Sequence, residues 1–380
     1  MFENILNVIQ DTYKTKGFIP LHDPKLTGNK KKYLNECIDS TFVSSVGKFV
    51  VDSEDKISSL AGTKYAIAIS NGTPPLLIPL ILANVESEEE ATTKPLAFVA
   101  AFNAFSYCGA KPVFVDVNKD TVGLSSSALK EFLEKNTLIK NQRCVDKEMG
   151  KIIKACVPIH TFGHPYKIDK IKDICDQYYI VVIEDAAESL GSLYKGGHTG
   201  TFGQMGMISF NGNKIITAGG GESILTNDEV LVKRPNYITT AAKESHKWVF
   251  NHDMIGYIYR MPNLNAALIV AQLEQLDSFV LNKREVKKAY EDFFFDTDIK
   301  FIKEPKDSRS NYWLNAIILK DNKQRDLFLY ETNSAGVMIS PIWALMNKLT
   351  MFKNAQWDDL NNAEWPEQRV MNIPSSVIAS

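Results

Sequence analysis

Between about residues 60 and 235 the chain alternates short apolar runs with amphipathic stretches. The apolar runs are rich in Val, Ile and Tyr and end at turn residues, which predicts buried strands. These runs are Tyr65 to Ile69, Pro112 to Val117, Ile152 to Ile159, Tyr179 to Ile183 and Gly206 to Phe210. Helical patterns such as Ser127 to Lys135 and Ile168 to Tyr178 lie between them. The alternation predicts an α/β fold with a mostly parallel sheet covered on both faces, and with ligands at the carboxyl ends of its strands.

The two ends of the chain follow different patterns. Three helices are predicted there: Ile5 to Tyr13, Lys31 to Ser40, and one long helix that begins near Pro262 and carries apolar residues as far as Leu276. A more mixed region follows the long helix. A chain of 380 residues is long enough to bury one large core and one smaller core. We therefore expect a large domain over residues 1–250, which includes the helical segment 1–40, and a smaller α+β domain over residues 251–380.

Composition narrows the possible functions. Hydrophobic residues make up 44% and charged residues 23% of the chain, as in ordinary globular proteins. The net charge of -2 gives no attraction to nucleic acid or to an anionic membrane, and no apolar run is long enough to span one. The five cysteines are scattered and never form a CxxC pair, which is typical of reduced thiols in a cytoplasm. His160 and His164 flank a turn without a third ligand, so no metal site is expected.

An acid at the end of a strand and a lysine in a loop form the first candidate pair. The apolar run Val181 to Ile183 leads directly into Glu184 and Asp185. A carboxylate at this position either caps a helix or faces a ligand cation. Lys214 follows the next predicted strand, and a lysine against apolar walls loses its charge easily and can form an imine. A lone lysine is more often a surface residue, but this acid and lysine together are what an aldehyde-pyridine cofactor needs.

Two further segments suit the phosphate and the ring of such a cofactor. Ser70-Asn71-Gly72-Thr73 lies between a predicted strand and an apolar helix, where backbone amides can bind a phosphate. The Ser209 hydroxyl could reach the same phosphate. Phe98 could lie flat against an aromatic ring. Taken singly, the first segment is better explained as an ordinary strand-to-helix turn, and a lone phenylalanine is more often a plain core residue.

Together these segments resemble the sugar aminotransferases of the DegT/DnrJ/EryC1/StrS family over nearly the whole chain. The segments that carry the resemblance are Gly62 to Ala66 with Ser70 to Thr73, Glu184 to Glu188, Ser209 to Lys214, Gly256-Tyr257 with Tyr259 to Ala267, Pro341 to Trp343, and Ile373 to Ser376. The resemblance implies the fold of aspartate-aminotransferase-like enzymes that use pyridoxal phosphate (fold type I). It also implies a homodimer whose active site lies at the subunit interface.

The resemblance assigns a role to each candidate residue. Lys214 would hold pyridoxal phosphate as an imine and act as general acid and base, and Asp185 would keep the pyridine nitrogen protonated. Glu188 would lie beside the ring, Phe98 would stack on it, and Gly72, Thr73 and Ser209 would hold the phosphate. The amino donor would be L-glutamate, and the acceptor a nucleotide-linked keto-sugar. The chain looks most like the branch that acts on UDP-linked 4-keto-6-deoxy amino sugars for bacterial surface glycans.

Several positions depart from the family's pattern. Pro74 and Pro75 follow Thr73, and Pro79 lies deeper in the helix expected there, where proline typically costs about 3 kcal/mol. The other departures are Ala101 for a threonine, Ile258 for an asparagine, Ser340 for an arginine and Asn347 for a histidine. They keep open a second reading, a protein with this fold and weak catalysis that acts as a binding or regulatory partner. A third reading, a sugar dehydratase, is disfavoured because Lys214 is present.

Overall fold

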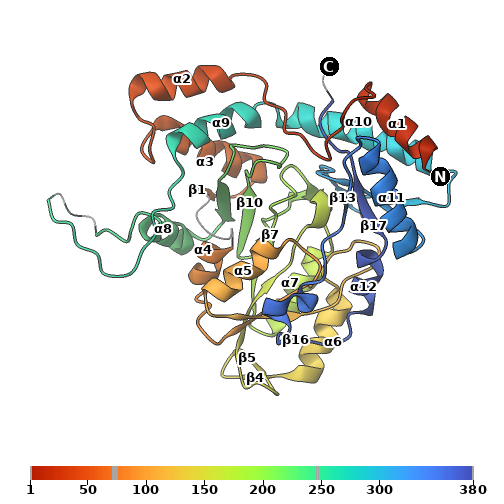
Figure 1. The fold of residues 1–380 in the computed structure, drawn as a ribbon. Coiled ribbons are helices and arrows are strands. Elements are labelled where there is room, and N and C mark those ends of the chain that lie inside the picture. Colours follow the sequence, from red (N-terminus) through yellow and green to blue (C-terminus); the bar gives the residue numbers. More distant parts are fainter. Residues whose placement is uncertain (1, 71–75, 245, 247, 379–380) are drawn as a thin grey trace.

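A sheet of eight strands forms the centre of the molecule (Figure 1). The computed structural model describes residues 2–70, 76–244, 246 and 248–378. In spatial order the strands are β1 (Tyr65–Ile69), β11 (Glu222–Thr226), β10 (Met205–Ser209), β7 (Val181–Asp185), β6 (Ile153–Val157), β2 (Glu90–Thr93), β3 (Lys111–Phe114) and β16 (Gln356–Trp357). Only β11 runs antiparallel to its neighbours, β1 and β10; the other pairs are parallel. The predicted α/β fold with a mostly parallel sheet is confirmed.

Helices cover both faces of this sheet because successive strand residues point to opposite sides. The helices of the large lobe are α2 (Lys30–Ser40), α3 (Lys48–Ala61), α4 (Leu77–Leu82), α5 (Val99–Tyr107), α6 (Ser126–Asn136), α7 (Ile168–Gln177), α8 (Glu229–Ile238) and α9 (Asn263–Leu273). Ala66 and Ala68 of β1 belong to the core that includes α3 and α9. Ile67 and Ile69 belong to the opposite core, which includes α4 and α5. The sheet therefore lies buried between two layers of helices.

A smaller lobe is built on a four-stranded antiparallel sheet. Its strands, in spatial order, are β12 (Lys300–Phe301), β14 (Asn315–Ile318), β17 (Val370–Ile373) and β15 (Ser340–Pro341), and its helices are α1 (Glu3–Tyr13), α10 (Leu276–Phe294), α11 (Asn322–Ser334) and α12 (Asn361–Glu367). The predicted boundary at residue 250 stays a prediction, and packing crosses it in both directions. Ile5 and Ile9 of α1 pack in the core of the small lobe, whereas β16 pairs with β3 in the large sheet.

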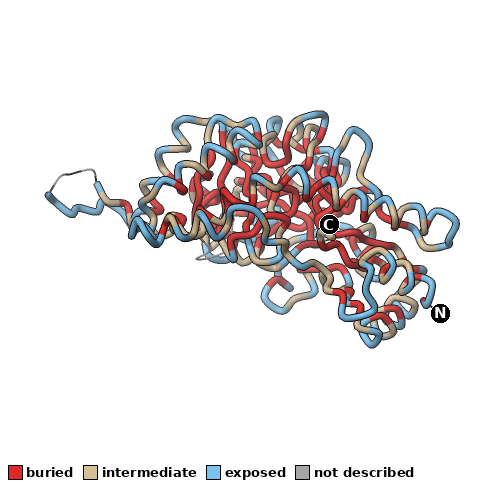
Figure 2. The backbone as a smooth tube through the Cα atoms, turned by 90° about the horizontal axis from the view of Figure 1, so that it is seen from above, coloured by how far each residue is buried: buried red, intermediate tan, exposed pale blue. Residues whose placement is uncertain are grey.

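Short elements complete the chain. They are β4 (Thr137–Lys140), β5 (Arg143–Asp146), β8 (Leu193–Tyr194), β9 (Gly197–His198), β13 (Ser308–Arg309), and the 3-10 turns η1 (Thr161–Gly163), η2 (Met346–Lys348) and η3 (Thr350–Phe352). The segment after α8 leaves the body of the molecule as a long arm, which Figure 2 shows to be largely exposed, whereas buried residues fill the interior.

The long helix expected from Pro262 is two helices. α9 ends at Leu273, α10 begins at Leu276, and their axes differ by 59°. The Gln275 amide bonds the Gln272 carbonyl across the break, which closes a turn between them. Within the described residues no single helix is long and apolar enough to cross a membrane; only this bent pair meets the criteria, when its two helices are combined.

The helix expected after Thr73 begins late, which is one of the two outcomes that its prolines allow, the other being a kink. α4 begins only at Leu77, so Pro79 is its third residue. The first intrahelical bond of α4 runs from the Leu80 amide to the Leu76 carbonyl, and the nitrogen of residue 79 needs no intrahelical acceptor. The proline therefore removes no hydrogen bond from the helix, and the cost expected for an interior proline does not arise.

Candidate active site

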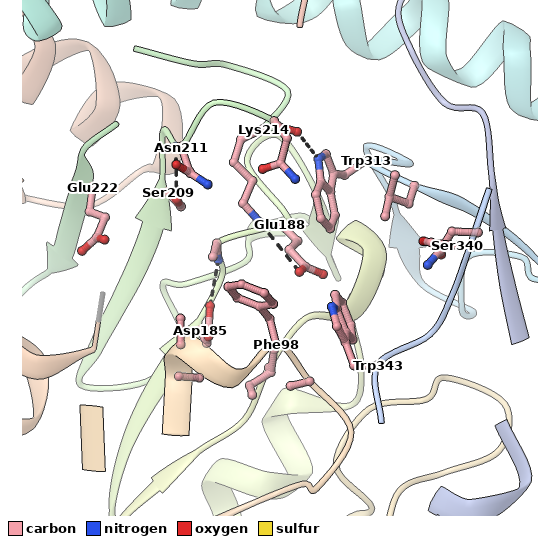
Figure 3. A pocket seen from close by; sticks show the side chains of 18 of the residues that line it. Phe98, Asp185, Glu188, Ser209, Asn211, Lys214, Glu222, Trp313, Ser340 and Trp343 are labelled. Atoms are coloured by element: carbon pink, nitrogen blue, oxygen red, sulfur yellow. Dashed lines mark hydrogen bonds and ion pairs between the residues drawn. The ribbon is translucent and has the colours of Figure 1, made fainter. Parts of the chain in front are cut away.

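A cavity of about 570 Å³ lies at the carboxyl ends of β7 and β10, where the two lobes meet. Its volume is in the range of small-molecule sites in proteins. The side chains of the lining that could bind or react with a ligand are Phe98, Asp185, Glu188, Ser209, Lys214, Glu222, Trp313, Ser340, Trp343 and Asn372 (Figure 3). The cavity therefore contains five of the seven site residues that the sequence predicted. Gly72 and Thr73 lie outside the described residues.

The two acids at the end of β7 face different surroundings, because adjacent strand residues point to opposite faces. The Glu184 carboxylate is fully buried and accepts hydrogen bonds from the Gly200, Phe202 and Gly203 amides at 3.0, 2.6 and 2.8 Å. It also lies 3.0 Å from His160 Nε2. These bonds occupy both of its oxygens, so Glu184 has a structural role.

Asp185 instead lines the cavity. Its Oδ1 accepts a hydrogen bond from the Ala187 amide at 3.1 Å. Burial raises the pKa of Asp185, although the Ala187 hydrogen bond and the charge of Lys214 partly oppose the shift. A ligand cation inside the cavity would favour the ionised form of this carboxyl.

Lys214 lies in the loop that follows β10, with its side chain directed into the cavity (Figure 3). Its Nζ is 3.7 Å from Glu188 Oε1 and 4.0 Å from the centre of the Trp313 ring. Burial lowers the pKa of Lys214, while the charges of Glu188 and Asp185 act in the opposite direction. A lowered pKa increases the fraction of neutral amine, which is the nucleophilic form.

Glu188 is held in place from behind. Its Oε2 accepts a hydrogen bond from the Phe162 amide at 2.7 Å, in a turn where Phe162 adopts a left-handed φ of 60°. Burial raises the pKa of Glu188, and Lys214 lowers it in part. The carboxylate is thus fixed beside the lysine that it faces.

The loop that carries Lys214 is closed at its base. The Phe210 amide bonds the Gly221 carbonyl at 2.8 Å, and Trp313 Nε1 donates to the Asn213 carbonyl at 2.7 Å. Gly221 has φ of 114°, and a Cβ there would overlap Met261. The triple glycine of the sequence therefore supplies a close approach and a turn, which a side chain at this position would prevent.

Phe98 and Ser209 also line the cavity. Phe98 precedes α5, and its side chain is 57% exposed, so the ring is available to a ligand (Figure 3). Ser209 ends β10 and is buried, and within the described part of the chain its Oγ accepts one long bond of 3.3 Å, from the Asn211 amide. Its hydroxyl proton is therefore available for a ligand oxygen.

Three residues of this region were not predicted from the sequence. Trp313 and Glu222 line the cavity, and no motif marked either of them. Lys94 is fully buried, and its Nζ donates to the Val122 carbonyl at 3.0 Å and to Thr161 Oγ1. Burial lowers the pKa of Lys94 to about 7. Glu222 follows the triple glycine, which is the one signal that could have drawn attention to it.

Two of the positions that depart from the family's pattern, Ala101 and Ser340, line the cavity as well. Ile258 is 86% exposed, on the projecting arm. Within the part of the chain that the structure describes, no group of three or more His, Cys, Asp or Glu side chains could hold a metal ion.

The contrast between Glu184 and Asp185 gives a stability prediction. Glu184→Ala would leave the buried Gly200 N–H and the partly buried N–H groups of Phe202 and Gly203 without acceptors, so it should lower the free energy of unfolding by about 3 kcal/mol. Asp185→Ala should change it by about 1 kcal/mol or less, because Asp185 accepts one hydrogen bond. Urea unfolding of the cofactor-free protein measures both values. A loss for Asp185→Ala as large as that for Glu184→Ala would contradict the division of roles.

Comparison with known proteins agrees with this site. The model of the DegT/DnrJ/EryC1/StrS aminotransferase family matches residues 24–378. A protein of Escherichia coli O157:H7 named GDP-perosamine synthase is 33% identical over 358 residues, which cover 94% of this chain and 93% of the relative. A Bacillus subtilis (strain 168) protein named putative pyridoxal phosphate-dependent aminotransferase EpsN is 32% identical over 338 residues, 89% of this chain and 84% of the relative.

A solved structure supports the fold. The aminotransferase TlmJ from Streptoalloteichus hindustanus superposes with a TM-score of 0.85 over 94% of both chains, at 22% sequence identity. This likeness concerns the fold, whereas the family match and the two relatives concern the chain as a whole. The chain therefore belongs to the DegT/DnrJ/EryC1/StrS aminotransferase family and is a sugar aminotransferase that depends on pyridoxal phosphate.

Proposed function

We propose that this protein transfers the amino group of L-glutamate to a keto-deoxy sugar linked to a nucleotide. The observation that carries the proposal is that Lys214 and Asp185, from two neighbouring strand ends, line one cavity. The cavity fits pyridoxal phosphate because it offers an amine for the aldehyde and a carboxylate for the pyridine nitrogen. When bound, the cofactor supplies an electron sink for the electrons released at the carbon that loses its proton.

The residues of the chain hold the cofactor and move the protons. Lys214 would attach the aldehyde carbon covalently, and Asp185 would keep the pyridine nitrogen protonated. The remaining contacts would come from Phe98 and Glu188 at the ring and from Gly72, Thr73 and Ser209 at the phosphate. Displaced by the donor, the Lys214 amine would take the proton from the donor's α carbon and return one at the sugar carbon that becomes the amine-bearing carbon. The lowered pKa of Lys214 favours this exchange, because it increases the fraction of the amine that can accept a proton.

The side of the cavity opposite β7 suits a sugar. Ser340, Trp343 and Asn372 line it, all from the small lobe. Asn372 Oδ1 is buried and has no hydrogen-bond partner among the described residues. A buried acceptor of this kind is costly unless a ligand donor reaches it, and sugar hydroxyls are such donors. These residues support a polyhydroxylated acceptor.

Two nucleotides are candidates for the acceptor. The UDP-4-keto-6-deoxy-HexNAc substrate is suggested by the likeness of the amino-terminal segment and of the Pro341 to Trp343 region. A GDP-linked keto-sugar is the second candidate, because the E. coli relative is named GDP-perosamine synthase. In either case the product would feed the synthesis of a bacterial surface glycan. Free thiols at all five cysteines support a cytoplasmic location.

The projecting arm supports a homodimer. It exposes a series of large apolar side chains: Trp248, Val249, Phe250, Met254, Ile255 and Ile258. A contiguous apolar surface of this kind usually marks a contact with another protein. We propose that a second copy of the chain covers the arm and that the active site lies at the resulting interface.

Removal of Lys214 tests the catalytic role. With pyridoxal phosphate, the protein should show a visible absorption band that L-glutamate bleaches. Lys214→Ala should lose the bleaching and lower turnover by at least about 1000-fold, because the covalent anchor and the proton carrier are the same amine. Lys94→Gln is the control, since Lys94 is a fully buried lysine that does not line the cavity, and it should keep the band. Full turnover by Lys214→Ala would rule out the assigned role. A band that glutamate does not bleach would favour the weakly catalytic binding protein.

A panel of acceptors tests the substrate. UDP-linked and GDP-linked 4-keto-6-deoxy sugars, offered with L-glutamate, should differ in kcat/KM by at least about 100-fold, because a site built to hydrogen-bond one base rejects another strongly. Mass spectrometry of the aminated product identifies the accepted sugar. Failure of every nucleotide-linked keto-sugar, under conditions where glutamate bleaches the band, would reject this acceptor class and leave the donor half-reaction standing.

A charged substitution on the arm tests the proposed dimer interface. Ile258→Asp should raise the dimer dissociation constant about 10-fold or more, because it would bury a charge in an apolar interface. Val230→Asp is the control, because Val230 is also an exposed apolar residue but lies on α8 rather than on the arm. Sedimentation velocity over a concentration series measures both constants. An unchanged constant for Ile258→Asp would exclude this part of the arm from the interface.

A further inference from the structure

Glu222 lies beside Ser209 at the edge of the cavity. It is the first residue of β11, and its direct partner on the antiparallel neighbour β10 is Ser209. Residues directly opposite each other in an antiparallel pair share a face, with Cβ atoms about 4.5–5.5 Å apart. Both side chains line the cavity (Figure 3). The Glu222 carboxyl is therefore a neighbour of whatever the Ser209 hydroxyl binds.

Among the described residues, no cation is paired with the Glu222 carboxyl to balance a negative charge. Glu222 is 4% exposed, and among the residues that the structure describes none gives its carboxyl a hydrogen bond or an ion pair. On β1 its partner is the apolar Ile69. Of the nearby cations, Lys214 Nζ is directed at Glu188, and Arg260 is paired with Glu54 at 2.8 Å.

The charged group that does act on Glu222 is another carboxylate. Burial and the charge of Asp185, from β7, both raise the pKa of Glu222 well above its usual value. Since burial without a partner disfavours the ionised form, the neutral acid is the form that this environment stabilises. A neutral carboxyl differs from a carboxylate in one decisive respect, because it can donate a hydrogen bond.

The phosphate end of the cofactor site, as proposed above, includes Ser209. The partners of Glu222 are Ser209 on one side and Ile69, the last residue of β1, on the other. An ionised Glu222 would place a negative charge beside a phosphate that itself carries about two. A neutral Glu222 would instead add one donor to the phosphate site. On the basis of the proposed function, we propose that Glu222 binds the cofactor phosphate as a neutral carboxylic acid, so that cofactor binding is coupled to protonation of this group.

The sign of the coupling follows from the protonation state. Below the pKa of Glu222 the acid is already neutral, and binding needs no proton uptake from this group. Above that pKa the carboxylate must take up a proton when the phosphate binds, so affinity falls about 10-fold per pH unit. The same group acts on folding. Because its folded-state pKa is raised, its contribution to stability is fully present below the unfolded-state pKa of about 4.3 and is lost as pH rises through the folded-state pKa.

Glu222→Gln removes the titratable acid and its negative charge but keeps a hydrogen-bond donor. The amide has nearly the same shape and can donate to a phosphate at any pH. We expect the ratio of the pyridoxal phosphate dissociation constants, wild type over Glu222→Gln, to be flat at low pH and to rise about 10-fold per unit at high pH. Quenching of the fluorescence of Trp313 and Trp343, which line the cavity, measures binding to the cofactor-free protein. Other titrating groups affect both proteins alike and cancel in the ratio.

Two controls isolate the phosphate. Pyridoxal, which lacks the phosphate, should give a ratio that does not vary with pH. Glu90→Gln removes another buried carboxyl of the same sheet, whose pKa burial raises to about 7 but which does not line the cavity, and it should leave cofactor affinity unchanged. An infrared difference spectrum between the cofactor-free wild type and Glu222→Gln should contain the carbonyl band of a protonated acid, which reports the state of Glu222 without any ligand.

The outcomes distinguish this inference from the proposed function. A ratio for pyridoxal phosphate that stays constant over pH, or a carboxylate band in place of the acid band, would overturn the role of Glu222. If Lys214→Ala still lost the glutamate response in that case, the proposed function would stand. Absence of pyridoxal phosphate binding by the wild type at every pH would instead reject the proposed function itself. Should Glu222→Gln fold poorly, Glu222→Ala serves in its place, with weaker binding at low pH and the same loss of pH dependence.

Discussion

The site depends on one electrostatic arrangement, a buried amine that faces two buried carboxyls. Burial lowers the pKa of Lys214 and raises those of Asp185 and Glu188, while attraction between the groups opposes each shift. Burial therefore brings the pKa of the amine and those of the acids closer together, which favours proton exchange between them more than between surface residues of the same types. The arrangement persists because Glu188 is fixed by the Phe162 amide and Lys214 is carried by a loop closed at its base.

Lys214 differs from the fully buried lysines of the chain in that it lines the cavity. Lys94 and Lys283 are fully buried, and burial lowers the pKa of each to about 7. Lys94 donates to the Val122 carbonyl and Thr161, and Lys283 to the Trp313 and Ser375 carbonyls. Their protons are thus committed to fixed acceptors, and neither lysine lines the cavity. Burial alone does not make a lysine available for a reaction. The lysine must also face a cavity that a ligand can enter.

The order and direction of the strands determine which acids have a structural role and which line the cavity. At the end of β7 the alternation of side chains directs Glu184 into a network of amides and Asp185 into the cavity. At the other side of β10 the antiparallel β11 brings Glu222 level with Ser209. A parallel strand at that position would present its opposite end to the cavity, and the Glu222 carboxyl would lie far from the strand ends that line it. One reversed strand therefore adds an acid to a site otherwise built from parallel strand ends.

The sequence by itself determined the fold class and the central pair, because strand ends are local features. β7 ends at Asp185, Lys214 lies in the loop that follows β10, and parallel strands place their carboxyl ends at one edge of the sheet. Tertiary structure decided what depends on neighbours far apart in the chain. The sequence of β2, Glu-Ala-Thr-Thr, has no apolar pattern, and only its place between β3 and β6 makes it a buried strand. Likewise, whether an acid is charged, hydrogen-bonded or able to donate is set by the groups packed around it, and Glu184 and Glu222 are the same residue type in different surroundings.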